Sequence, residues 1–201
     1  MKLPEKLLRM EPYDPSVEPF DVKLDANENA CTVNAAAQAR IRAALERVEL
    51  NRYPDPAARA LRQAAAAYFG VEAENIGCGC GSDEILSLLM QHFVPSGGLA
   101  AMSEFDFSMY AFYARGAERR VRTVPVDGAL RLEADSLIEA ARGADLLIFS
   151  NPCNPTGQGL PRAEVLRVVE ESDCLVVVDE AYMEFWDQSV ADAVGEYPNL
   201  I

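Results

Sequence analysis

Residues 145–157 read Asp-Leu-Leu-Ile-Phe-Ser-Asn-Pro-Cys-Asn-Pro-Thr-Gly, and this stretch decides the fold. Its first six residues contain an uninterrupted apolar run at 146–149, which predicts a strand over 145–150 that is buried on both faces. Two Asn-Pro steps then end the strand, because proline fixes its own φ angle and lacks an N–H group. We therefore expect Asn151 and Asn154 to present their amides in set directions at the end of the strand. A purely structural turn is the other interpretation.

Short apolar runs and helical stretches alternate around this segment. Strands are expected at 98–102, 120–124, 145–150 and 174–179, and helices at 34–50, 56–69, 84–93, 107–116, 133–142 and 161–171. Asn34, Asp55 and Ser82 are the expected N-caps of the first three helices, and Gly70 is expected to end the second. The alternation predicts an α/β fold whose mostly parallel sheet is flanked by helices on both faces.

Composition excludes several classes of function. The chain has 201 residues and a formal net charge of −14, which disfavours nucleic-acid binding. No apolar run approaches the ~20 residues of a membrane span, and the first residues lack the apolar stretch of a secretory signal, so a cytoplasmic location is expected. One histidine, His92, and five cysteines without zinc spacing give no metal site.

Three polar segments follow expected strands or open an expected helix, at 77–84, 150–157 and 179–182. Ligands of open α/β sheets bind outside the carboxyl ends of the strands, so these segments predict a single site. The glycine-rich stretch 77–84 suits a phosphate but matches neither a Walker loop nor a dinucleotide fingerprint, and a plain turn capped by Ser82 is the alternative. Asp179 could pair with a cationic ring nitrogen, lie in solvent, or bind Mg²⁺ in a nucleotide enzyme.

These residues resemble the amino-terminal part of a fold-type-I pyridoxal-phosphate (PLP) enzyme, and more closely a histidinol-phosphate aminotransferase. The segments that carry the resemblance lie in the family's order along the whole chain. They are Pro12-Tyr-Asp-Pro15, Lys23-Leu-Asp-Ala-Asn-Glu-Asn29, Asn51-Arg-Tyr-Pro-Asp-Pro56, Gly79-Cys-Gly-Ser-Asp-Glu84, Asn151-Pro-Cys-Asn-Pro-Thr-Gly157 and Asp179-Glu-Ala-Tyr182. The resemblance implies an arm at 1–30 and an incomplete large PLP-binding domain at 31–201.

The resemblance also implies roles for residues around the cofactor. Ser82 and Asp83 would offer backbone N–H groups to the PLP phosphate. Asp179 would pair with the protonated pyridine nitrogen and so keep the ring an electron sink. Tyr182 and Asn154 would hydrogen-bond the ring hydroxyl from opposite sides.

Other implied roles concern the ring face, the neighbouring subunit and the substrate. Phe107 stands where the family usually stacks a tyrosine on the ring. Tyr53 would reach the cofactor phosphate of the neighbouring subunit, which makes a homodimer part of the site. Tyr13, Asn27 and Glu28 would lie beside the substrate. Simple packing is the alternative for Tyr13 and Phe107.

The lysine that holds PLP covalently in this family lies about thirty residues beyond the Asp-Glu-Ala-Tyr strand. The present sequence ends at Ile201, and its three lysines, Lys2, Lys6 and Lys23, belong to the amino-terminal region. We therefore expect the chain alone to be inactive, although its family would transfer amino groups between an amino-alcohol phosphate and 2-oxoglutarate in histidine biosynthesis. Threonine-phosphate decarboxylase-like, aromatic-aminotransferase and nucleotide-binding activities stay open, as does an inactive fragment kept as an interaction partner.

Overall fold

A computed structural model describes Leu8 and residues 21–201. The described residues divide between two compact units, 21–57 in one and 58–201 in the other, and each is considered by itself. Tyr13 and the prolines of the expected arm lie outside the described residues. The boundary expected at residue 30 stays a prediction.

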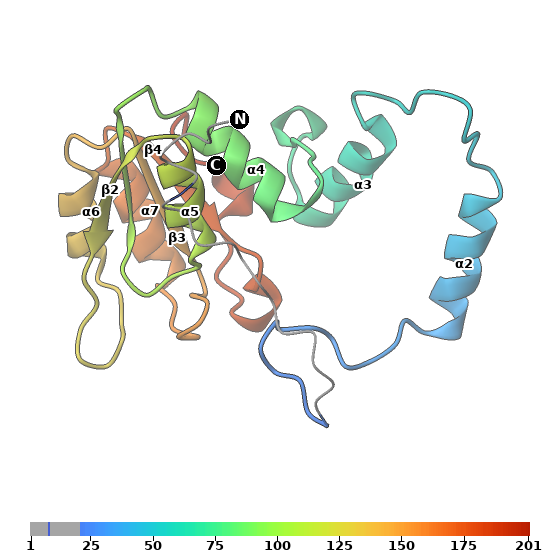
Figure 1. Cartoon of the computed structure of the whole chain (residues 1–201), viewed down its shortest axis with the longest axis horizontal. Coiled ribbons are helices and arrows are strands. Elements are labelled where there is room, and N and C mark those ends of the chain that lie inside the picture. Colours follow the sequence, from blue (N-terminus) through green and yellow to red (C-terminus); the bar gives the residue numbers. More distant parts are fainter. Residues whose placement is uncertain (1–7, 9–20) are drawn as a thin grey trace. The chain divides into compact units, whose positions relative to one another are not determined.

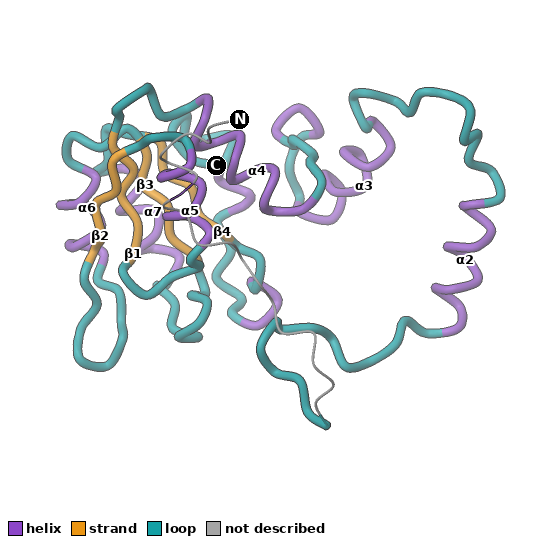
Figure 2. Tube along the Cα trace, in the orientation of Figure 1, coloured by secondary structure: helices purple, strands orange, loops and turns teal. Residues whose placement is uncertain are grey.

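A four-stranded parallel sheet forms the centre of the 58–201 unit (Figure 2). Its strands are β1 (Leu99–Ser103), β2 (Arg120–Val124), β3 (Leu146–Ser150) and β4 (Leu175–Asp179), in the order β2-β1-β3-β4. All neighbouring pairs are parallel, which confirms the predicted sheet. The register places Ser150 opposite Asp179, so the two polar strand ends lie side by side.

Helices cover both faces of this sheet (Figure 1). On one face α4 (Gly81–His92) and α5 (Met109–Gly116) pack against Leu146 and Ile148, and on the other α6 (Ala134–Ala141) and α7 (Arg162–Glu170) pack against Leu147 and Phe149. Successive side chains of a strand point to opposite faces, so β3 needs apolar residues at every position. This explains why the run at 146–149 shows no alternation of polar and apolar residues.

Strand β4 has a further neighbour on its outer side. Leu200 forms a parallel bridge with Val176. The backbone N–H of Val176 donates to the Asn199 carbonyl at 2.7 Å, and that of Ile201 donates to the Val176 carbonyl at 2.9 Å. The backbone around Leu200 therefore continues the sheet beside β4.

The 21–57 unit contains the helix α2 (Ala35–Leu45). The Asn34 side chain accepts a hydrogen bond from the Ala37 N–H at 2.9 Å, which confirms the predicted N-cap. The helix ends at Leu45 rather than at residue 50, and none of its residues is buried.

The helix α3 (Arg59–Phe69) begins later than predicted. Asp55 accepts a hydrogen bond from the Ala57 N–H at 3.1 Å and so closes a local turn instead of capping the helix. Ala58 is in the left-handed region, at φ 45°, and separates that turn from the helix. Gly70 ends α3 at φ 73°, as predicted.

The remaining regular elements are short. They are three single 3-10 turns at Ala73–Asn75, Met183–Phe185 and Ala191–Ala193. Among the described residues, no helix is both long and apolar enough to cross a membrane.

Candidate functional site

The polar segments predicted to meet at the carboxyl edge of the sheet do meet there. A small hollow of about 80 Å³ lies at this edge. It is lined by Ser82, Phe107, Tyr110, Ser150, Asn154, Asp179, Ala181 and Tyr182. Five residues singled out in the sequence are thus brought together from four separate segments, while their individual roles stay predictions.

Asp179 is the last residue of β4, and its carboxylate is held at both oxygens. Oδ2 accepts a hydrogen bond from the Tyr110 hydroxyl at 2.7 Å, and Oδ1 accepts one from the Ala181 N–H at 3.0 Å. Each carboxylate oxygen has capacity for another bond, so the group can still receive a donor from the hollow. The carboxylate is therefore oriented before any ligand arrives.

Tyr110 is a site residue that the sequence did not reveal. It lies on α5 and is 1% exposed, and its ring packs edge-on against Phe107 with centroids 5.7 Å apart. Burial, together with the negative charges of Asp106 and Asp179, raises the pKa of Tyr110 well above its usual range. The hydroxyl consequently stays protonated and remains a donor to Asp179.

A second carboxylate, Asp106, lies in the loop between β1 and α5. It accepts hydrogen bonds from the Phe107 N–H at 2.8 Å and the Ser150 N–H at 3.0 Å, and a very short one from Ser150 Oγ. Ser150 Oγ in turn accepts from the Asn154 N–H at 3.1 Å. Burial raises the pKa of Asp106 to about 6, although the bonds from Ser150 oppose that shift.

The start of α4 forms another part of the hollow. Ser82 is not the N-cap that we expected: the cap position is Cys80, and Ser82 lies within the first turn. No side chain of the described residues caps the first-turn N–H groups of α4, and the Glu84 carboxylate reaches back to accept the N–H of Cys80 itself at 2.6 Å. First-turn N–H groups, such as those of Ser82 and Asp83, have no acceptor inside a helix and suit an anion.

Three other predicted residues belong to the 21–57 unit, so no distance to the hollow is assigned to them. Tyr53 is fully exposed within that unit. Glu28 forms an ion pair with Lys23 at 3.2 Å, and Asn27 adopts a left-handed backbone at φ 52°. Their proposed roles, like that of Tyr13, stay predictions.

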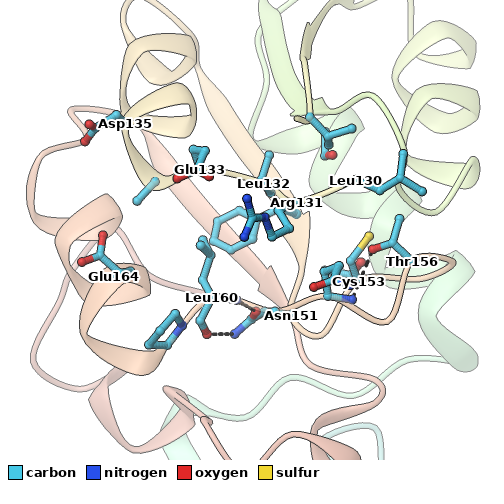
Figure 3. A pocket seen from close by; sticks show the side chains of 18 of the residues that line it. Leu130, Arg131, Leu132, Glu133, Asp135, Asn151, Cys153, Thr156, Leu160 and Glu164 are labelled. Carbon is cyan, nitrogen blue, oxygen red and sulfur yellow. Dashed lines mark hydrogen bonds between the residues drawn. The ribbon is translucent and has the colours of Figure 1, made fainter. Parts of the chain in front are cut away.

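A larger hollow of about 270 Å³ is lined by the turn that follows β3, by the start of α6 and by the residues before it (Figure 3). Its arginines are already neutralised, since Arg131 pairs with Asp127 at 2.7 Å and Arg167 pairs with Asp135 and Glu164. The predicted segment 150–157 contributes Asn151, Cys153 and Thr156 to it, but none of the residues expected to contact cofactor or substrate lines it. This hollow is larger than the first, but the oriented carboxylate and the helix start favour the first as the site. In the part of the chain that the structure describes, no group of three metal-ligating side chains is found.

Known proteins are similar to this chain in sequence and in architecture. The family model described as aminotransferase class I and II matches residues 21–201. Histidinol-phosphate aminotransferase of Clostridium novyi is 37% identical over 192 residues, covering 94% of this chain and 54% of that protein. The same enzyme of Pyrococcus furiosus is 33% identical over 197 residues, covering 98% and 57%. The chain thus spans about half the length of the curated relatives it matches.

Solved structures agree with the sequence matches. Histidinol-phosphate aminotransferase from Sinorhizobium meliloti, solved in complex with pyridoxal-5'-phosphate, superposes with a TM-score of 0.78 at 27% identity, covering 87% of this chain and 49% of that one. L-threonine-O-3-phosphate decarboxylase from Porphyromonas gingivalis superposes with a TM-score of 0.67 at 23% identity, covering 83% and 52%, and shows a common fold alone.

Proposed function

Because this chain belongs to the aminotransferase class I and II family, we propose that it forms the cofactor-binding part of a PLP-dependent aminotransferase. The whole enzyme would transfer an amino group between histidinol phosphate and 2-oxoglutarate. The names of relatives 33–37% identical to this chain support that substrate. A cytoplasmic homodimer is proposed for the complete protein, in which Tyr53 serves the neighbouring subunit.

The observation that carries this proposal is the convergence of complementary groups on the small hollow. Asp179 offers an oriented carboxylate, and the first turn of α4, at Ser82, offers free N–H groups. Phe107 adds an aromatic ring, and Tyr182 and Asn154 add polar side chains. An anion-binding helix start and a carboxylate around one hollow fit a ligand with a phosphate and a cationic ring, which is the chemistry of PLP.

Bound PLP supplies an electron sink for bonds to the reacting carbon of an amino substrate. In the proposed site Asp179 would keep a proton on the ring nitrogen, and Tyr110 would hold that carboxylate in place. Tyr182 and Asn154 would fix the ring hydroxyl, while Phe107 would cover one face of the ring. The N–H groups of Ser82 and Asp83 would hold the phosphate.

A threonine-phosphate decarboxylase activity is the second candidate, because the P. gingivalis enzyme shares the fold. Amino-acid identity favours the histidinol-phosphate enzyme, since relatives of that name reach 37%. Assays of the complete gene product with histidinol phosphate and with threonine phosphate distinguish the aminotransferase from the decarboxylase, and an aromatic amino acid tests the aromatic-aminotransferase alternative. Amino transfer to 2-oxoglutarate from histidinol phosphate is expected, and carbon dioxide release from threonine phosphate would instead support the decarboxylase.

Binding is tested on the present chain with pyridoxine 5′-phosphate, which lacks the aldehyde and needs no lysine. We expect calorimetry to detect binding by the wild type and a loss of at least about tenfold in Asp179→Ala, because the ring nitrogen loses its charged partner. Asp127→Asn, remote from the hollow, is the matched control. Equal affinity of the wild type and Asp179→Ala would contradict the assignment of Asp179.

A further inference from the structure

Two walls of the small hollow come from segments far apart in the sequence. The loop that follows β1 carries Phe107, and the turn that follows β3 carries Asn154. The two strands are neighbours in the sheet, so the two connections start side by side. The pairing between β1 and β3 ends at Met102 and Ile148. It therefore cannot fix the relative position of the loop and the turn that follow these two strands.

Two side chains connect the loop and the turn beyond the strand ends. Cys153 Sγ donates a weak hydrogen bond to the Phe105 carbonyl at 3.1 Å, and Asp106 supplies the remaining, stronger connection. Its carboxylate accepts a bond from the Phe107 N–H within its own loop and two bonds from Ser150 on the other wall. Ser150 Oγ then accepts the Asn154 N–H. A continuous hydrogen-bonded path therefore runs from Phe107 through Asp106 and Ser150 to Asn154.

We propose that Asp106, in its carboxylate form, is the positioning residue that joins the Phe107 loop to the Asn154 turn. A carboxylate offers acceptors only, and here three donors use it. Protonation would remove the negative charge that strengthens these three hydrogen bonds, because charge-assisted bonds are stronger than neutral ones. The connection is consequently strongest when Asp106 is ionised.

The surroundings of Asp106 place its ionisation in an accessible pH range. The titratable side chains that interact with Asp106 are Asp179 at the end of β4 and Tyr110 on α5. Neither carries a positive charge that would stabilise the Asp106 carboxylate. The salt bridges of the described residues do not include Asp106. Burial raises its pKa to about 6, and the charge of Asp179 acts in the same direction. The hydrogen-bonded connection between the Phe107 loop and the Asn154 turn would therefore weaken as the pH falls through about 6.

The decisive measurement follows backbone amide resonances of the ligand-free chain between pH 4.5 and 8. In the wild type the Phe107 and Ser150 amides should titrate together with a midpoint near pH 6. The isosteric Asp106→Asn should abolish that shared titration. The matched control Asp127→Asn removes a carboxylate that also accepts two backbone N–H bonds, from Ala129 and Arg131 rather than from Phe107 and Ser150, and it should leave the titration intact.

A second variant tests the proposal even if Asp106→Asn does not fold. Ser150→Ala removes one donor to the carboxylate, and since that bond lowers the pKa of Asp106, the shared midpoint should move to higher pH. Amides of Phe107 and Ser150 that do not titrate, that titrate at different pH values, or that still titrate in Asp106→Asn would overturn the proposal.

A separate measurement, the affinity for pyridoxine 5′-phosphate, rests on the proposed function, whereas the amide titration does not. At pH 7.5, Asp106→Asn should bind pyridoxine 5′-phosphate about tenfold more weakly than the wild type, as expected for the loss of one charge-assisted hydrogen bond. If the wild type does not bind this probe, the proposed function fails, while the amide titration still decides the role of Asp106. Unchanged affinity in Asp106→Asn would overturn the positioning role in the bound state.

Discussion

The Asp179 carboxylate is oriented by one buried hydroxyl and one backbone N–H. Tyr110 is almost completely buried and donates to Oδ2 at 2.7 Å, while the backbone of Ala181 holds the other oxygen. A hydrogen bond to a charged group contributes about 1.5–3 kcal/mol, more than a bond between neutral groups. Tyr110 should therefore contribute to stability as well as to the geometry of the hollow.

Replacing Tyr110 with phenylalanine tests this contribution. Because the ring stays and only the hydroxyl is lost, the free energy of unfolding should fall by about 1–2 kcal/mol in urea denaturation. Tyr197→Phe is the matched control, since its hydroxyl donates to the exposed Glu170 carboxylate at the same 2.7 Å, and its loss should change stability by less than about 0.5 kcal/mol. Equal effects of the two variants would show that burial does not strengthen the Tyr110 bond.

The sequence was a good guide to residues that follow strands or lie in recognisable segments, such as Ser82, and a poor one to a residue inside a helix. Asn154 and Asp179 were found because each follows a buried apolar run. Asp106 follows β1 in the same way, so the same rule could have found it. Tyr110 was not recognisable, because it lies among apolar residues of α5 and only the tertiary structure brings its hydroxyl to Asp179.

Among the elements, strands were predicted more accurately than helix starts. A strand covered on both faces must be apolar at every position, and that requirement is visible in the sequence. A helix start depends on local turns and on which polar groups bond the backbone there. At α4 the cap position is Cys80, whose N–H donates to Glu84, and Ser82 lies inside the first turn. At α3 the expected cap, Asp55, closes a turn instead.

The central role of β3 gives a prediction at the level of the element. Phe149 is fully buried, in contact with the core under α6 and α7, so Phe149→Ala should lower the free energy of unfolding by about 3–5 kcal/mol. Phe185→Ala is the control: that side chain is 85% exposed, and its removal should change stability by no more than about 0.5 kcal/mol. Urea denaturation measures both, and a small loss in Phe149→Ala would mean that β3 is not central to the core.

At the level of the whole molecule, the two compact units differ in how completely each buries its own apolar side chains. The 58–201 unit buries both faces of its sheet, whereas α2 in the 21–57 unit has no buried residue and leaves Ile41 and Leu45 exposed within that unit. Tyr53 lies in the same unit with its whole ring exposed. Exposed side chains of this kind can pack against other residues of the chain or against another subunit, and the proposed homodimer requires the second case for Tyr53.

Mixing two defective variants of the complete gene product tests whether the sites are shared. If Tyr53 serves the neighbouring subunit, a mixed dimer of Tyr53→Ala and Asp179→Ala contains one site with both native residues and one site with neither. Random exchange makes half of the dimers mixed, so about a quarter of the wild-type aminotransferase activity should return. Each variant put through the same exchange alone is the control and should gain nothing. Absence of recovery, with exchange verified by mass spectrometry of the mixed dimer, would place Tyr53 in the site of its own subunit or outside the site altogether.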